Sequence, residues 1–168
     1  MTARQPLTRS AVETVLMRVV ECPPRVGTYD HARWHRDILL LAWVLHHPRR
    51  TPELPFITWK PDNSGHAYLS ENGRWMYRDI KSTVDPMRAS YRLATPVAEV
   101  LTAYLDGARN KLVKAESDSL FSMQSGHLQY RLLTLIERYY GKEVGMAEVI
   151  ALQGDSPSTG IRKGVTGN

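Results

Sequence analysis

The sequence predicts an α+β domain that is mainly helical and carries a small three-stranded antiparallel sheet. Apolar residues recur with helical spacing in the first and last thirds of the chain. Between them, an Asn-Gly pair stands between two strand-like runs and favours a β-hairpin. The length of 168 residues suits one domain, which can bury a core without disulfides or a structural metal.

Two helices are expected in the N-terminal part of the chain. The first opens at Thr8 or Ser10, because Ser10 and Glu13 have the spacing of a capping box. It ends at a pair of prolines, which have no backbone N–H to continue the helix. The second helix is capped by Asp30, carries a strongly apolar stripe and ends at Pro48. We expect this second helix to form the centre of the core.

A short helix and a three-stranded sheet are expected next. Thr51 would be the N-cap of the short helix and Pro52 its first residue, where the missing N–H costs nothing. Strands are expected at residues 66–70, 74–80 and 90–94. Since the Asn-Gly turn joins the first two strands directly, the sheet should be antiparallel.

Two amphipathic helices complete the predicted domain. Thr95 and the proline after it open a helix over residues 97–112, whose apolar residues follow one face. A polar loop leads to a helix at 128–140, which a glycine follows in a position suited to a C-terminal cap. We therefore expect one domain over residues 1–153. Residues 154–168 are rich in glycine and serine, which favours a flexible tail.

Charge and composition favour a polyanionic partner. Lys and Arg number 22 against 17 Asp and Glu, a net charge of +5, and nucleic acid is the first candidate. The single cysteine, Cys22, excludes a disulfide framework and favours a reducing, cytoplasmic compartment. The longest apolar run, Ile38–Leu45, is shorter than the ~20 residues of a membrane span, so no membrane association is expected.

No metal or cofactor is expected. His31 and His35 have the i, i+4 spacing that can chelate zinc, but no third ligand lies near them in the sequence. The chain has no phosphate-binding glycine-rich loop followed by lysine, and no serine in the context of a nucleophile elbow.

One stretch in the first half of the chain carries a resemblance to a known family. A buried helix is followed by Arg50, two spacer residues, Glu53 and Leu54, with Trp59 a few residues later. This pattern resembles the first catalytic box of the tyrosine recombinases, the phage-integrase family. The resemblance covers residues 6–150, because the sheet, the proline-started helix and the last helix follow in that family's order.

The resemblance implies both a fold and a function. The fold would be the N-terminal part of a tyrosine-recombinase catalytic domain, and the protein would bind duplex DNA during integration or recombination. Arg50 would stabilise the charge that grows on the scissile phosphate, and Lys81 would be the general acid. Two plainer interpretations stay open: Arg50 could pair with Glu53, and Lys81 could be an exposed residue at a strand end.

Further basic residues are candidates for contact with DNA. Arg49 is expected to be solvated or to touch the DNA backbone, and basic residues around the sheet could follow phosphates. The resemblance also places the helix at 128–140 near DNA, where Gln and Arg can read base edges. The candidates are Arg49, Arg74, Arg78, Arg88, Arg92, Gln129, Arg131 and Arg138.

The second half of the family's catalytic pattern is missing from this sequence. After the sheet there is no His-x-x-Arg on a helix, and the last tyrosines, Tyr139 and Tyr140, lie within an amphipathic pattern. Without a nucleophile, strand cleavage is not expected. A fragment of a longer recombinase, a natural truncation and a relative kept for binding would all fit.

Three functional readings therefore stay open. The first is a recombinase-like DNA-binding domain, with other recombinase subunits as further partners. The second is a catalytically inactive, recombinase-derived regulator that binds DNA. The third is an unrelated basic α+β module for protein–protein interaction, in which the box is a coincidence.

Overall fold

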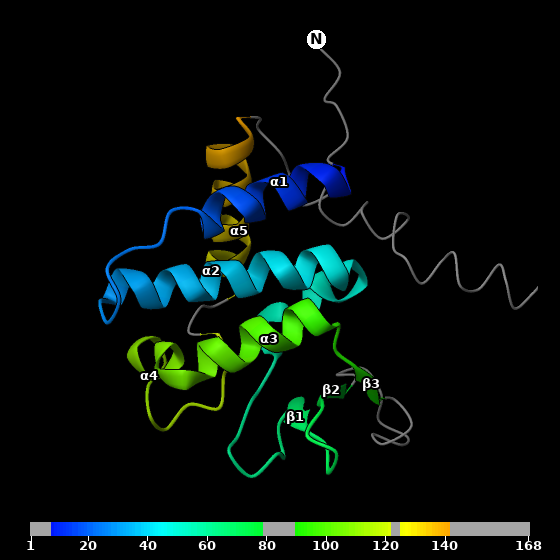
Figure 1. The fold of residues 1–168 in the computed structure, drawn as a ribbon. Helices are drawn as coiled ribbons and strands as arrows, with labels where there is room; N and C mark the ends of the chain where they lie inside the picture. Colours follow the sequence, from blue (N-terminus) through cyan, green and yellow to red (C-terminus); the bar gives the residue numbers. More distant parts are fainter. Residues whose placement is uncertain (1–7, 79–89, 122–124, 142–168) are drawn as a thin grey trace, which may run out of the picture.

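The computed structural model describes residues 8–78, 90–121 and 125–141, and of residues 49, 50, 125 and 126 it describes the backbone only (Figure 1). The predicted class is confirmed, since the fold is α+β with one three-stranded antiparallel sheet. The helices are α1 (Arg9–Val20), α2 (Tyr29–His46), the 3-10 helix η1 (Pro48–Phe56), α3 (Thr95–Ala103), η2 (Tyr104–Ala108), α4 (Arg109–Leu112) and α5 (Ser125–Tyr140). The strands are β1 (Ala67–Leu69), β2 (Trp75–Arg78) and β3 (Ser90–Arg92).

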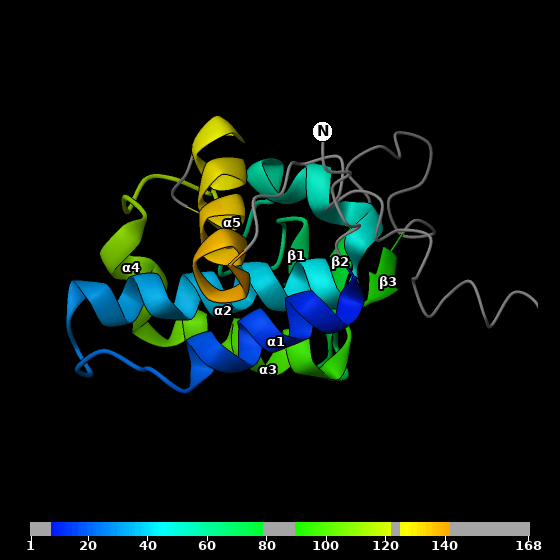
Figure 2. The ribbon, with the colours of Figure 1, turned by 90° about the horizontal axis from the view of Figure 1, so that it is seen from above.

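Helix α2 is the centre of the core, as predicted. Every residue from Ile38 to Leu45 is buried, because the helix is apolar on all sides over these two turns. Helices α1, α3 and α5 pack directly on it. Figure 1 shows α1 and α3 on opposite sides of α2, and both views show α5 running at a steep angle to α2 (Figure 2). None of the helices in the described part of the chain has the length and apolar character needed to cross a bilayer.

The sheet has the order β1-β2-β3, and its inner face looks toward the helices. Ala67, Tyr77 and Tyr91 stand opposite one another across the three strands. The predicted hairpin is confirmed between β1 and β2, and its glycine, Gly73, has φ +76°, which only glycine adopts without strain. The third strand ends at Arg92, earlier than the sequence predicted.

Of the two predicted starts of α1, Thr8 is confirmed as the cap, whereas the predicted cap of α2 is wrong. The hydroxyl oxygen of Thr8 accepts from the backbone N–H three residues later at 3.1 Å, so the capping box at Ser10 is not used. Helix α2 is capped in the same way by Thr28, and Asp30 lies in its first turn. Threonine and aspartate are both good cap residues, so residue type alone does not distinguish Thr28 from Asp30. The path of the backbone before the helix decides which of them is the cap.

The helix predicted over residues 97–112 is interrupted. Thr95 is its first residue and not its cap. Asp106 and Gly107 leave helical geometry, and Gly107 has φ +111°. A residue with a side chain would be strained there, whereas glycine tolerates this conformation. The last helix agrees with the prediction, since Gly141 has φ +77° and its N–H donates to the carbonyl of Glu137. The proposed tail at 154–168 lies outside the described residues.

Candidate nucleic-acid interface

The backbone of the Arg50 box lies in η1. This 3-10 helix begins at Pro48, three residues before the predicted N-cap Thr51. The hydroxyl of Thr51 is instead buried and donates to the carbonyl of Pro48 at 2.8 Å. Glu53 is only 5% exposed and Leu54 is fully buried. Glu53 and Leu54 therefore belong to the packed interior at the end of α2, and the glutamate is not a solvated surface residue.

A hydrogen bond connects the box to the sheet. The phenol of Tyr77 on β2 donates to Oε2 of Glu53 at 2.7 Å. Tyr77 is fully buried and packs edge-on against Trp43 of α2, with ring centroids 5.6 Å apart. Next to it, Nε2 of His47 accepts from the backbone N–H of Ala94, just before α3, at 3.1 Å. The end of α2, the box, β2 and the start of α3 are thereby fixed to one another.

The sequence patterns marked Glu53 and Leu54 but held no sign of Tyr77 or His47. Tyr77 alternates with exposed positions in a strand pattern, which indicates an inward side chain but no particular partner. His47 follows α2 directly in a His-His-Pro run that indicates only a helix end. Their partners lie 24 and 47 residues away, beyond the reach of a local pattern.

Arg74 and Arg92 are the two sheet arginines whose side chains are exposed. Arg92 stands opposite Met76, and Arg74 precedes Met76 by two residues, so both belong to the same face of the sheet. In the described ranges neither guanidinium group has a hydrogen bond or an ion pair. Both are therefore open to a ligand.

Arg78 and Arg131, in contrast, have partners within the protein. Arg78 lies over the ring of Tyr68, 3.7 Å from its centroid, and donates to the carbonyls of Asn63 and Gly65 at 3.0 and 2.5 Å. Arg131 donates from Nε and Nη2 to the two carboxylate oxygens of Asp37 at 3.2 and 2.7 Å, which raises its pKa. A contact of either arginine with DNA stays a prediction, and it would compete with these bonds.

The remaining candidates divide between α5 and undescribed positions. Gln129 is half-buried, and Arg138 is exposed with its guanidinium over the ring of Tyr139. Lys81 and Arg88 lie outside the described residues, as do the side chains of Arg49 and Arg50.

No protein family, curated protein or solved structure matches this chain. The order of elements that accompanies the box in the sequence is present in the structure: a buried helix, the box, a three-stranded antiparallel sheet and a proline-started helix. Membership of the tyrosine-recombinase family stays a prediction.

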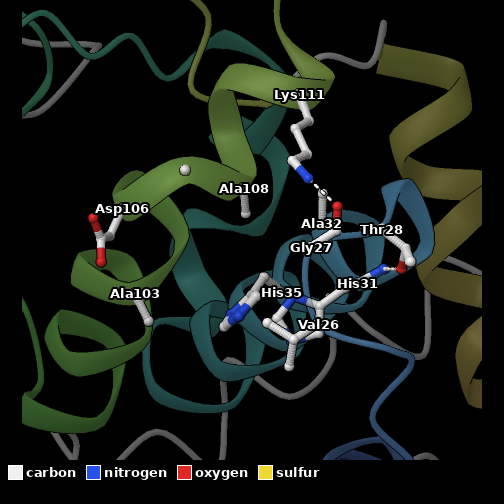
Figure 3. A pocket seen from close by; sticks show the side chains of 11 residues that line it. Val26, Gly27, Thr28, His31, Ala32, His35, Ala103, Asp106, Ala108 and Lys111 are labelled. Atoms are coloured by element: carbon white, nitrogen blue, oxygen red, sulfur yellow. Dashed lines mark hydrogen bonds between the residues drawn. The ribbon is translucent and has the colours of Figure 1, made fainter.

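The two histidines with zinc-chelating spacing lie beside a hollow. A cavity of about 180 Å³ separates the start of α2 from the break at Gly107, and Figure 3 shows His31 and His35 side by side along it. Their ring centroids are 4.7 Å apart. Lys111 reaches across to the carbonyl of Gly27. Within the described ranges, no group of three metal-ligating side chains is formed.

Half-buried histidines make the stability depend on pH. Burial lowers the pKa of His35, His46 and His66 below the ordinary value of 6.5. The neighbouring charge of His31 adds to this effect at His35, and Arg9 adds to it at His46, where Glu13 opposes it. At His66, Glu53 opposes the lowering of the pKa and Arg78 adds to it.

We expect the free energy of unfolding to fall as the pH drops below 6.5. In this window the unfolded chain binds more protons at these histidines than the folded chain does, so protonation favours unfolding. Urea unfolding at about pH 7.5, 6.5 and 5.5 measures the effect, because histidine is the side chain that normally titrates there. Replacing His66 by Gln should reduce the dependence of the unfolding free energy on pH, because it removes one of these histidines. A stability that stays constant down to about pH 5.5 would contradict the expectation.

Proposed function

We propose that this chain binds duplex DNA as a tyrosine-recombinase-like domain that acts in DNA integration or recombination. The observation that carries the proposal is the Glu53–Tyr77 hydrogen bond, because it fastens the Arg50 box to the sheet. That sheet presents Arg74 and Arg92 without protein partners in the described part of the chain. A DNA strand that reaches the box would thus meet further positive charge on the attached sheet.

Phosphate chemistry explains why arginines are suited to this role. A guanidinium group is always charged, and its planar fork can donate two hydrogen bonds to one phosphate. The net charge of +5 favours association with a polyanion over a longer range. By its resemblance to the family, Arg50 would hold the phosphate and Lys81 would lie near the departing sugar oxygen.

The proposal concerns binding and not strand cleavage. The sequence pattern supplies an arginine and a lysine for a phosphate, but no tyrosine nucleophile in the family's context. The proposal includes a cytoplasmic location, which the single cysteine favours, and other recombinase subunits as further partners on the same DNA.

Duplex binding measured by fluorescence anisotropy at several salt concentrations tests the proposal. Phosphate contacts predict that log affinity falls linearly with log salt. Arg50→Ala should weaken binding by about tenfold or more, since a hydrogen bond to a charged group is worth about 1.5–3 kcal/mol. Arg25→Ala, which removes an exposed arginine from the loop between α1 and α2, is the matched control and should have little effect.

Two results would contradict the proposal. Absence of binding at about 50 mM salt would favour the protein–protein module instead. If Arg50→Ala and the unmodified chain bind DNA with equal affinity, Arg50 does not contribute to DNA binding.

A further inference from the structure

The surface between the β1–β2 hairpin and α3 contains a cleft of about 200 Å³. Arg74 and Arg92 line it from the sheet, and Thr95 and Glu99 line it from α3. The cleft lies at the hairpin end of the sheet. The opposite end is formed by Arg78, from which the chain continues toward Lys81.

Strand register brings the two arginines of the cleft together. Because Arg92 stands opposite Met76, Arg74 is its diagonal neighbour on the adjacent strand. Such positions place Cβ atoms about 7–8 Å apart, within reach of long side chains that converge on one group. Two guanidinium forks can therefore contact one phosphate or its immediate neighbour.

Arg74 and Arg92 differ from Arg78 and Arg109 in their hydrogen-bond partners. Arg78 donates to two backbone carbonyls, and Arg109 donates to the carbonyls of Ser117 and Ser119. Arg74 and Arg92 have no such partners in the ranges that the structure describes. Arg78 and Arg109 thus have hydrogen-bond partners within the protein, whereas Arg74 and Arg92 are available to a ligand.

The floor of the cleft is firmly packed. Trp75 is 9% exposed, and its indole N–H donates to the hydroxyl of Thr102 on α3 at 2.9 Å. Leu93, next to Arg92, is almost fully buried. These contacts join the hairpin to α3, so the backbones that carry the two arginines have fixed positions relative to each other.

Charge and size favour a phosphodiester as the occupant. The lining residues of the cleft include two arginines and one glutamate, Glu99, and this balance of +1 suits the single negative charge of a backbone phosphate. The cleft also has room for part of the attached sugar, and the hydroxyl of Thr95 can donate to an oxygen there.

We propose that this cleft binds a backbone phosphate of duplex DNA through Arg74 and Arg92, as an anchoring contact separate from the Arg50 box. The inference rests on the proposed function and assigns a particular contact to it. The contact positions the duplex across the sheet and carries no sequence information, since phosphates are common to all sequences.

The salt dependence of DNA binding by Arg74→Gln/Arg92→Gln tests the assignment. Each lost phosphate contact lowers the slope of log affinity against log salt by about 0.9, so the double variant should lose about 1.8. The affinity ratio between 50 and 200 mM salt should then be about 12-fold smaller than for the unmodified chain. Glu99→Gln should act in the opposite direction and strengthen binding, because it removes a like charge from the phosphate site.

A double variant elsewhere provides the control. Arg25→Gln/Lys114→Gln removes the same charge at two exposed residues outside the cleft, and its slope should remain that of the unmodified chain. All the replaced side chains are exposed, so we expect every variant to fold, and thermal unfolding checks this.

The outcomes separate the two proposals. An unchanged slope in Arg74→Gln/Arg92→Gln, or weaker binding by Glu99→Gln, overturns the cleft assignment while DNA binding itself stands. Equal slope losses in the two double variants also overturn it, since net charge alone would explain them. Absence of DNA binding by the unmodified chain overturns the proposed function.

Discussion

Asp37→Ala is expected to lower the free energy of unfolding by about 3–5 kcal/mol, the range for breaking a buried ion pair. Asp37 is 3% exposed, and its carboxylate accepts from Nη2 of Arg36 at 3.1 Å as well as from Arg131. Arg36 is itself 5% exposed. Removing the carboxylate would leave the charge of Arg36 buried beside an empty volume and would detach Arg131 of α5 from α2.

Urea unfolding of Asp37→Ala and Asp30→Ala measures this effect against a matched control. Asp30 lies in the first turn of α2 and pairs with Arg33 at 3.1 Å, but both side chains are largely exposed. An exposed pair of this kind contributes less than about 1 kcal/mol. Similar losses in the two variants would show that the cluster around Asp37 does not hold α5 to α2.

Gly65→Ala is expected to destabilise the fold by about 3 kcal/mol, at the upper end of the range for overpacking. A Cβ atom at this position would lie 2.7 Å from the carbonyl oxygen of Thr58 and 2.8 Å from Cα of Trp59. Both are backbone atoms of the segment that bridges to Ala67, so no flexible side chain can move aside. The methyl group would therefore displace this segment from β1.

Gly73→Ala is the control for this second prediction. Gly73 has φ +76°, but a Cβ atom there would meet no other atom within 4 Å. Its replacement therefore costs only the conformational strain of about 1–2 kcal/mol. Thermal unfolding of the two variants and the unmodified chain gives the comparison. A Gly65→Ala variant as stable as Gly73→Ala would contradict the close approach of the two backbone segments.

Local sequence signals were sufficient for the helices and the hairpin. The apolar spacing around Val15 and through α2 follows from the geometry of a single helix, and the Asn-Gly turn needs only its flanking strands. The break at Gly107 had a signal too, since glycine inside a helical pattern lowers helix propensity. The apolar pattern nevertheless continued through Ala108, which packs in the core beyond the break, and this concealed the interruption.

The candidate site was less accessible to sequence reasoning. Arg74 and Arg78 both alternate with inward residues of β2, so the sequence assigns them the same role. Their difference arises in three dimensions, because Tyr68 and the loop carbonyl of Gly65 lie next to Arg78 only. Arg131 on α5 likewise finds its carboxylate partner on α2 across 94 residues of chain. Tertiary packing therefore decides which of these arginines has a partner within the protein.

The bond between Glu53 and Tyr77 has a consequence for the order of folding. Helix α2 and the segment after it are complete in a chain that has grown to residue 56, yet the phenol that binds the carboxylate is 24 residues further along. Until the hairpin packs against α2, Glu53 lacks this donor, and burying its carboxylate costs more free energy. We therefore expect the segment around Glu53 to reach its native packing only when the sheet packs over Trp43.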